Sequence, residues 1–291
     1  MANVLVMTDT VACIPPKFAK ELNIKIVPAA LINIADRTYI DGVDLSAQEA
    51  YAQLQKDPDS FSTSQITPKY LLDKYRELGK EPLDVLFITL SSALSAVIQS
   101  AKLAAEEYKK EAPDVNIMVL DSKAVAGTQG LVVLAAARAA ANGKPLDEIA
   151  IIATKAREVT GGLVMLDTLK YVYRTGRMSK TKARIISFFN IRPINRINEA
   201  GEIVMVDKTR KREKGLNKLL ELIGQESETD SLHFAISHSA ALATAQGFAE
   251  QIKAKYNALS ITISDYSPVM GYGAGPGCIF VGFQPELDFA Q

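Results

Sequence analysis

The sequence predicts an α/β protein of two domains, with a parallel, doubly wound sheet in the N-terminal domain and a mixed sheet in the C-terminal domain. In the first half, short runs rich in Val and Ile alternate with helical patterns, an order typical of βαβ units. In the second half, a hairpin pattern surrounds Ala200-Gly201, so some strands there must be antiparallel. The length of 291 residues, 48% of them hydrophobic, suits two domains, which we place at 1–155 and 156–291.

The elements of the first half follow from apolar runs and helix signals. Ser46 and Glu49 form a capping box, and Thr67 before Pro68 is a second helix start. Strands are expected over residues 3–8, 24–34, 84–90 and 116–122. Helices are expected over residues 15–22, 46–56, 95–110 and 130–141 and from Pro68 onward.

The second half of the chain shows different sequence patterns from the first. Residues 166–183 are amphipathic and basic, and residues 194–211 carry the hairpin pattern. Strands are expected over 233–238, 258–266 and 278–283, and helices over 211–222 and 240–256.

The charge balance and the number of cysteines limit the classes of function that the protein can have. With 33 basic and 33 acidic residues, the net charge is zero, so long-range attraction to nucleic acid or anionic membranes is not expected. The first residues do not form a signal peptide, and no apolar run is long enough to span a membrane. With only Cys13 and Cys278, the simplest expectation is a reduced, cytoplasmic protein.

Several common catalytic and cofactor motifs are absent from the sequence. The glycines of Gly271–Phe283 have the GxG spacing of a nucleotide-binding loop, but a strand pattern follows them where a dinucleotide site requires a helix. His233 and His238 bracket one short strand, and both cysteines are isolated, so no metal cluster is expected. His238 precedes Ser239, but the nucleophile elbow of a serine hydrolase is missing.

Three polar clusters lie at predicted strand ends or helix starts. They are Ser62–Gln65, Thr89–Ser95 and Asp121-Ser122. In open α/β sheets, ligands bind beyond the carboxyl ends of the strands, where helix N-termini offer free N–H groups. Hydroxyl groups beside such N–H groups suit a carboxylate or a phosphate, although Ser and Thr are also ordinary helix caps. The clusters together favour one shared anion-binding pocket.

An ordered set of motifs resembles the DegV family over nearly the whole chain. The motifs are TDT (Thr8–Thr10), YIDGVDLS (Tyr39–Ser46), STSQITP (Ser62–Pro68), ITLSSALSAVIQSA (Ile88–Ala101), VLDS (Val119–Ser122), LDTLKYVYRTGRMS (Leu166–Ser179), IRPI (Ile191–Ile194) and GPG (Gly275–Gly277). The resemblance implies a bacterial fatty-acid-binding protein without a cofactor, in which a palmitate-like chain is buried between two α/β domains. It also implies a partner, a fatty-acid kinase subunit resembling dihydroxyacetone kinase, which makes the acyl-phosphate for phospholipid synthesis. The binding protein itself then has no catalytic residues.

The resemblance also nominates site residues. The Thr of the TSQ motif is Thr63 and the Ser of the LSG-type motif is Ser95, and both are expected to hold the carboxylate. Ser92 is a neighbouring candidate, and the GPG backbone is expected to pack against the head group. Arg177 is expected near the site and the partner surface. The full predicted ligand-binding set is Thr63, Ser64, Ser92, Ser95, Arg177, Gly273, Gly275 and Gly277.

The tail is expected to supply most of the affinity. Each buried methylene contributes about 0.8 kcal/mol, so a sixteen-carbon chain offers on the order of 10 kcal/mol before ordering costs. A carboxylate in apolar surroundings must be hydrogen-bonded or it takes up a proton. We therefore expect Thr63 and Ser95 to set the orientation of the ligand.

Departures from the family pattern leave two alternatives open. The family often has His-Thr before GPG, where this chain has Gly273-Ala274, so one donor to the carboxylate is lost and a larger head group gains room. The first alternative is therefore a carrier of another amphiphile. The second is an enzyme that acts on a small anion with Asp9, Asp121 or His238 as acid or base.

Two basic clusters are candidates for partner contacts. Arg174, Arg177, Lys180 and Lys182 surround the Arg motif and are the preferred docking site for the kinase. The run Lys208–Lys214 is interpreted as a solvated strand end and helix start.

Overall fold

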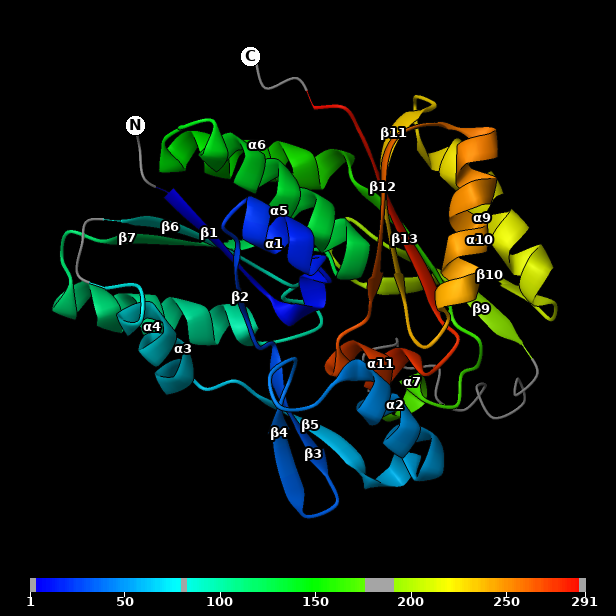
Figure 1. Ribbon diagram of the computed structural model, residues 1–291, viewed down its shortest axis with the longest axis horizontal. Helices are drawn as coiled ribbons and strands as arrows, with labels where there is room; N and C mark the ends of the chain where they lie inside the picture. Colours follow the sequence, from blue (N-terminus) through cyan, green and yellow to red (C-terminus); the bar gives the residue numbers. More distant parts are fainter. Residues whose placement is uncertain (1–3, 80–82, 176–190, 288–291) are drawn as a thin grey trace.

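The computed structural model describes residues 4–79, 83–175 and 191–287, which form three β-sheets with helices between and around them (Figure 1). The three sheets have four, six and three strands. The chain therefore contains the two expected large sheets and a small sheet that the sequence did not predict.

The first sheet is entirely parallel, with the strand order β2-β1-β6-β7. Helices cover both of its faces, with α3 and α4 on one side and α1, α5 and α6 on the other (Figure 1), so the predicted doubly wound arrangement is confirmed. The strands are β1 (Val4–Asp9), β2 (Lys25–Val27), β6 (Asp84–Thr89) and β7 (Asn116–Asp121). The helices are α1 (Pro16–Glu21), α3 (Pro68–Arg76), α4 (Val97–Glu111), α5 (Ala126–Ala141) and α6 (Leu146–Val159).

The second sheet is mixed, as predicted, with the order β10-β9-β8-β13-β11-β12. Only β11 and β12 run parallel to each other, and the other neighbours are antiparallel. The strands are β8 (Gly161–Met165), β9 (Arg192–Ile197), β10 (Ile203–Thr209), β11 (Ser231–His238), β12 (Asn257–Asp265) and β13 (Ile279–Pro285). The helices α9 (Arg212–Glu226) and α10 (Leu242–Lys255) pack on one face.

Helix α5 lies between the two large sheets (Figure 1). It is buried around nearly its whole circumference, which explains why it is apolar on all sides. A Cβ added at Gly127 would lie 2.3 Å from the Ala235 carbonyl oxygen of β11, so only glycine allows this close approach. The predicted start of this helix, Gly130, was four residues late.

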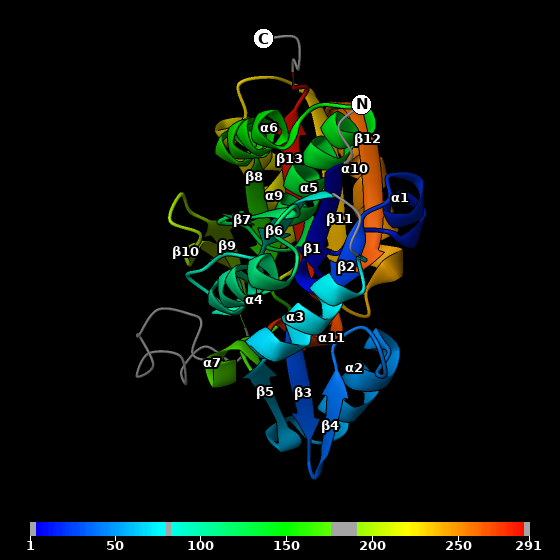
Figure 2. The ribbon, with the colours of Figure 1, turned by 90° about the vertical axis from the view of Figure 1, so that its left-hand side faces the viewer.

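The small antiparallel sheet has the order β4-β3-β5 and projects away from the two large sheets (Figure 2). Its elements are β3 (Ala30–Ile34), β4 (Arg37–Ile40) and β5 (Phe61–Gln65), with α2 (Ala47–Lys56) packed on α11 (Pro268–Ala274) beside it. The polar cluster Ser62–Gln65 is therefore a strand and not a loop before a helix. Short elements complete the chain: η1 (Thr10–Ala12), η2 (Pro58–Ser60) and α7 (Val172–Thr175).

The two helix caps and the hairpin predicted from local sequence motifs are confirmed. Ser46 Oγ accepts from the Glu49 N–H at 3.2 Å, and Thr67 Oγ1 accepts from the Tyr70 N–H at 3.2 Å. Strands β9 and β10 form the expected hairpin, with Gly201 at φ 80° in its turn. The proposed domain boundary after residue 155 falls inside α6 and stays a prediction.

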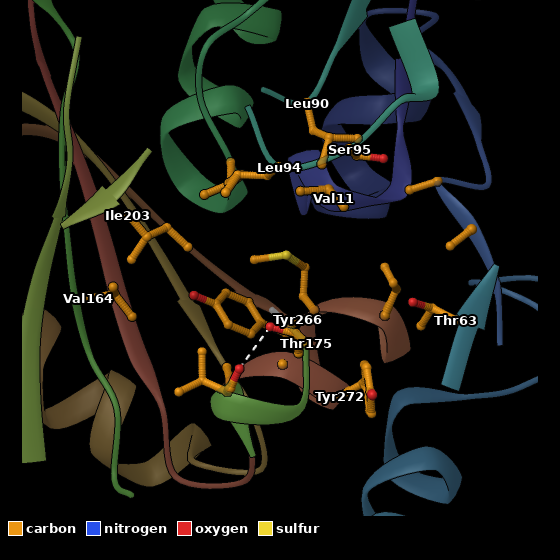
Figure 3. A pocket seen from close by; sticks show the side chains of 18 of the residues that line it. Val11, Thr63, Leu90, Leu94, Ser95, Val164, Thr175, Ile203, Tyr266 and Tyr272 are labelled. Atoms are coloured by element: carbon orange, nitrogen blue, oxygen red, sulfur yellow. Dashed lines mark hydrogen bonds between the residues drawn. The ribbon is translucent and has the colours of Figure 1, made fainter. Parts of the chain in front are cut away.

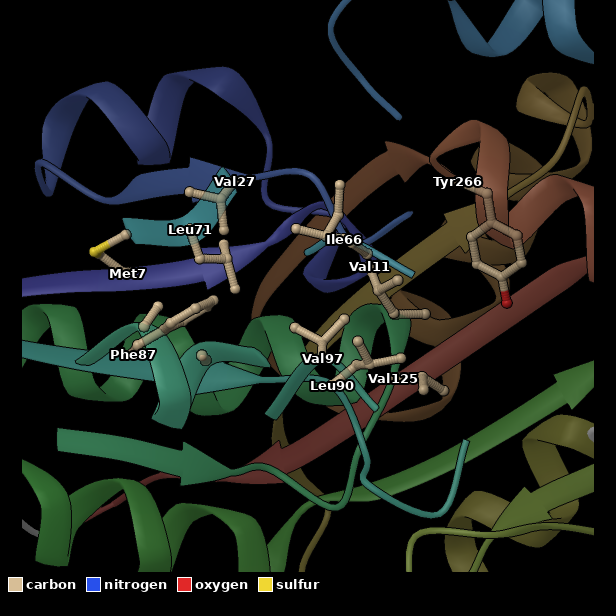
Figure 4. Close-up of a cluster of buried hydrophobic side chains, with 14 of the residues drawn as sticks. Met7, Val11, Val27, Ile66, Leu71, Phe87, Leu90, Val97, Val125 and Tyr266 are labelled. Carbon is tan, nitrogen blue, oxygen red and sulfur yellow. The ribbon is translucent and has the colours of Figure 1, made fainter. Parts of the chain in front are cut away.

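A continuous hydrophobic cluster connects the first sheet to the junction of all three sheets. Figure 4 shows Met7 and Phe87 at one end and Val125 and Tyr266 at the other. Within the described ranges, no helix is long and apolar enough to cross a membrane.

Candidate ligand-binding site

An elongated cavity of about 470 Å³ lies where the three sheets meet. This volume is within the range of small-molecule sites. Most of its wall is apolar and comes from both large sheets, the small sheet and α11 (Figure 3). The lining residues are Val11, Ala29, Ala30, Thr63, Ser64, Gln65, Leu90, Leu94, Ser95, Ala96, Val125, Val164, Leu166, Val172, Thr175, Asn195, Ile197, Ile203, Tyr266, Val269, Met270, Tyr272, Gly273, Ala274 and Phe280.

Two hydroxyl groups mark one side of the cavity. Thr63 on β5 and Ser95 before α4 both lie on the side away from Val164 and Ile203 (Figure 3). Among the described residues, neither hydroxyl has a hydrogen-bond partner, and α4 begins without a side-chain cap. These groups are therefore available to a ligand.

Gln65 holds the two hydroxyl-bearing segments together. Its Nε2 donates to the Ala96 carbonyl at 2.9 Å and to Ser100 Oγ at 2.7 Å. Because side chains alternate along a strand, Gln65 and Thr63 share one face of β5. The spacing of Thr63 and Gln65 thus fixes a hydroxyl group of the small sheet beside the N-terminus of α4.

The other end of the cavity is formed by the second sheet. Val164 of β8 and Ile203 of β10 lie there (Figure 3), and Phe280 of β13 is paired with Val164. This wall is apolar apart from Asn195, which is paired with Val164 on the next strand. The cavity therefore has the hydroxyl groups of Thr63 and Ser95 on one side and a mainly hydrocarbon surface, formed by the second sheet, on the other.

No acidic, basic or cysteine side chain is among the described residues that line the cavity. Its titratable groups are the phenols of Tyr266 and Tyr272, and burial raises the pKa of Tyr266 well above its ordinary value. The described lining thus contains no carboxyl, imidazole or amino group, the side chains that most often serve as general acid or base.

The TDT and YIDG motifs lie behind the cavity wall and hold its segments together through hydrogen bonds. Thr10 Oγ1 donates to Asp41 and accepts from the Ala29 N–H at 3.1 Å, while Asp41 accepts from the Val269 N–H at 3.0 Å. Burial raises the pKa of Asp41 to about 6. This network connects the end of β1 to the small sheet and to α11.

Asp9 is the second buried carboxyl group behind the wall. It accepts from the Leu90 N–H at 2.7 Å, the Val11 N–H at 3.1 Å and Gln129 Nε2 at 3.1 Å. Burial raises the pKa of Asp9 to about 7. Asp9 therefore fixes the backbone at Val11 and Leu90, both of which line the cavity. This structural role of Asp9 was not predicted, although its position as a polar residue directly after a predicted buried strand could have indicated it.

Four of the predicted site residues line the cavity. They are Thr63, Ser64, Ser95 and Gly273. The Ser64 hydroxyl accepts from Asn33 Nδ2 at 3.4 Å, so its side chain is engaged on the other face of the small sheet. Thr63, Ser95 and Gly273 are the members of the set whose placement best fits a ligand contact.

Ser92, Gly275 and Gly277 do not line the cavity. The expectation that the GPG backbone packs against the head group is not met at this cavity, and the surroundings of the two glycines give another reason for them. A Cβ at Gly275 (φ 73°) would lie 2.1 Å from the Tyr171 ring, and one at Gly277 (φ 89°) would lie 2.9 Å from Asp167 Cβ. Both glycines thus accommodate protein side chains.

Arg177 lies outside the described residues, as do Lys180 and Lys182 of the preferred docking cluster. The remaining member, Arg174, pairs with Asp59 at 2.7 Å.

The acid–base candidates of the enzyme alternative are not brought together at the cavity. Asp9 lies behind its wall, and neither Asp121 nor His238 lines it. Asp121 accepts from the Lys123 N–H at 2.8 Å, and His238 lies beside Asp265. Among the described residues, no group of three or more His, Cys, Asp or Glu side chains could hold a metal ion.

Comparisons with known proteins agree over nearly the whole chain. A family model described as an uncharacterised protein of the DegV family matches residues 3–286. A DegV domain-containing protein of Clostridium perfringens is 31% identical over 286 residues, which are 97% of this chain and 98% of that protein.

Solved structures of DegV family proteins also match nearly the whole chain. DegV of Bacillus subtilis, described as a fatty acid binding protein, is 26% identical, with a TM-score of 0.86 over 98% of this chain and 100% of that one. A fatty acid binding DegV family protein from Streptococcus agalactiae is 25% identical, with a TM-score of 0.85 over 99% and 100% of the two chains.

Proposed function

Since this chain belongs to the DegV family, we propose that it is a carrier that buries a long-chain fatty acid in the cavity between its sheets. The carboxylate accepts hydrogen bonds from Thr63 and Ser95, and the tail extends toward Val164 and Ile203. The fatty-acid binding of the relatives from Bacillus subtilis and Streptococcus agalactiae supports the assignment.

The observation that carries the proposal is a mostly apolar cavity in which the hydroxyl groups of Thr63 and Ser95 both lie on the side away from Val164 and Ile203 (Figure 3). The two hydroxyls and the uncapped N-terminus of α4 together suit a single carboxylate, because hydrogen bonds to a charged group are the strong ones. The hydrocarbon wall matches the tail, which contributes on the order of 10 kcal/mol before ordering costs for a chain of palmitate length.

The chemistry of the bound acid is assigned to a partner. We propose that a fatty-acid kinase subunit resembling dihydroxyacetone kinase phosphorylates the presented carboxylate, in the cytoplasm, for phospholipid synthesis. The absence of carboxyl, imidazole and amino groups among the described lining residues supports a carrier without its own chemistry. The segment around Arg174 and Arg177 is the proposed docking surface.

The direct test is mass spectrometry of an organic extract from the purified, denatured protein. A fatty acid of palmitate or stearate length, present at a one-to-one ratio with the chain, is expected. A protein that contains no lipid, and that binds no added palmitate, would refute the carrier.

A carrier of a different amphiphile is the second candidate, and one observation favours it. Among the described residues, a Cβ at Gly273 would meet only the Thr175 methyl group, at 3.4 Å, so these residues leave room where the family often has His. The same extract distinguishes the two candidates, because a non-acidic lipid would identify the second.

A further inference from the structure

Asn195 is a buried polar side chain in the apolar wall of the cavity. It lies on β9, an inner strand, between Val164 of β8 and Met205 of β10. Its exposed fraction is 0%, and it lines the cavity. Val164 is on the side of the pocket opposite Thr63 (Figure 3), so Asn195 belongs to the end that would receive the tail.

The amide of Asn195 lacks any partner among the described residues. Neither Nδ2 nor Oδ1 makes a hydrogen bond, although both atoms are buried. The neighbours on the same face of the sheet, Val164 and Ile197, are apolar and offer no donor or acceptor. A buried amide that loses its hydrogen bonds is strongly disfavoured, so a group that enters the cavity must supply them.

Asn195 occupies a position of β9 where the strand pattern favours an apolar residue. Ile194 faces the core under α9, and Asn195 and Ile197 face the cavity, as the alternation of a strand requires. Asn is also disfavoured within strands. Neither packing nor strand propensity therefore accounts for this residue.

Resting on the carrier function proposed above, we infer that the natural ligand is a fatty acid with a hydroxyl group on the distal half of its chain. A hydroxyl satisfies both amide atoms at once, because it accepts from Nδ2–H and donates to Oδ1. A plain hydrocarbon tail satisfies neither. Asn195 thus selects the ligand by its tail, while Thr63 and Ser95 hold the carboxylate.

Binding of a series of acids to the lipid-free protein tests the inference. The probes are stearic acid, 2-hydroxystearic acid and hydroxystearic acids with the hydroxyl on successive carbons from the middle of the chain to its methyl end. At least one distal hydroxy acid is expected to bind about five- to 150-fold more tightly than stearic acid. The 2-hydroxy isomer, whose hydroxyl remains beside the carboxylate, is expected to show no such gain.

The variant Asn195→Leu, which is similar in size and apolar, is the matched control. It is expected to lose the preference and to bind stearic acid at least as tightly as the wild type. A preference that survives in this variant would overturn the inference, because another group would then recognise the hydroxyl. The series on the wild-type protein decides the question even if the variant does not fold.

Failure of the inference is distinguishable from failure of the carrier function. If stearic acid binds and no distal hydroxy acid binds more tightly, the inference is overturned while the carrier stands, and a bound water is then the partner of Asn195. If no acid of the series binds, the carrier function and the inference both fail.

Discussion

Replacing Thr63 with Val should separate ligand binding from folding. The two side chains have nearly the same shape, and the Thr63 hydroxyl has no partner among the described residues, so stability should change little. A hydrogen bond to a carboxylate contributes about 1.5–3 kcal/mol, which predicts a ten- to 150-fold rise in the Kd for palmitate. The apolar tail still contributes on the order of 10 kcal/mol before ordering costs, so binding should weaken but persist.

Thr67→Val provides a matched control four residues away. The Thr67 hydroxyl caps α3 through the Tyr70 N–H, so its loss should cost about 1 kcal/mol of stability and leave the Kd unchanged. Fluorescent fatty-acid displacement gives the Kd, and urea unfolding of the lipid-free protein gives the stability. An unchanged Kd in Thr63→Val, with the lipid still in the cavity, would refute the placement of the carboxylate.

Four further perturbations test the scaffold and the cavity. Gly275→Ala should destabilise the protein by about 2–5 kcal/mol in urea, because the added Cβ meets Tyr171 at 2.1 Å in a backbone region that favours glycine. Gly247→Ala, where an added Cβ would meet no described atom within 4 Å apart from its own stretch of helix, should instead stabilise α10 by about 0.5–1 kcal/mol. The pKa of Asp9 is raised to about 7 in the folded protein, from an ordinary value of 3.8, so the folded state keeps a proton that the unfolded chain releases. The contribution of Asp9 to stability should therefore fall by about 3 kcal/mol as the pH rises from 4 to 7, and Asp9→Asn should flatten the slope by this amount; an unchanged slope in that variant would contradict the shift. Ile203→Phe should fill the distal end of the cavity and shift the extracted fatty acids to shorter chains, and an unchanged chain-length profile would place the tail elsewhere.

The large sheets could be predicted from the sequence because their signals are local. Buried parallel strands appear as continuous apolar runs, and the capping residues Ser46 and Thr67 act within three residues of themselves. Strand β5 was missed because Ser62 to Gln65 are all polar, so the segment shows no alternation of apolar and polar side chains. It is a strand because Ser62 to Gln65 pair with β3, and such non-local pairing leaves no mark in a short window.

The site was predictable only where a motif carries it. Thr63 and Ser95 came from the family resemblance, and both line the cavity. The reason for the GPG glycines could not be found, because the ring that excludes a side chain from Gly275 belongs to Tyr171, more than 100 residues earlier. Asn195 gave no signal either, since a strand pattern does not show whether its inner face meets a core or a cavity.

The distribution of polarity in the cavity bears on how a carrier can be selective. An apolar wall favours the binding of any hydrocarbon chain, since each methylene contributes about the same free energy of binding wherever it lies. Discrimination must then come from the few positions where a polar group would be left unsatisfied by the wrong ligand, because that penalty is larger than the gain from one more methylene. The hydroxyls of Thr63 and Ser95 face one end of the cavity and the unpaired amide of Asn195 faces the other. The ligand that we propose meets both ends, so its polar groups must lie at a fixed separation, and this arrangement would select for the position of the hydroxyl along the chain.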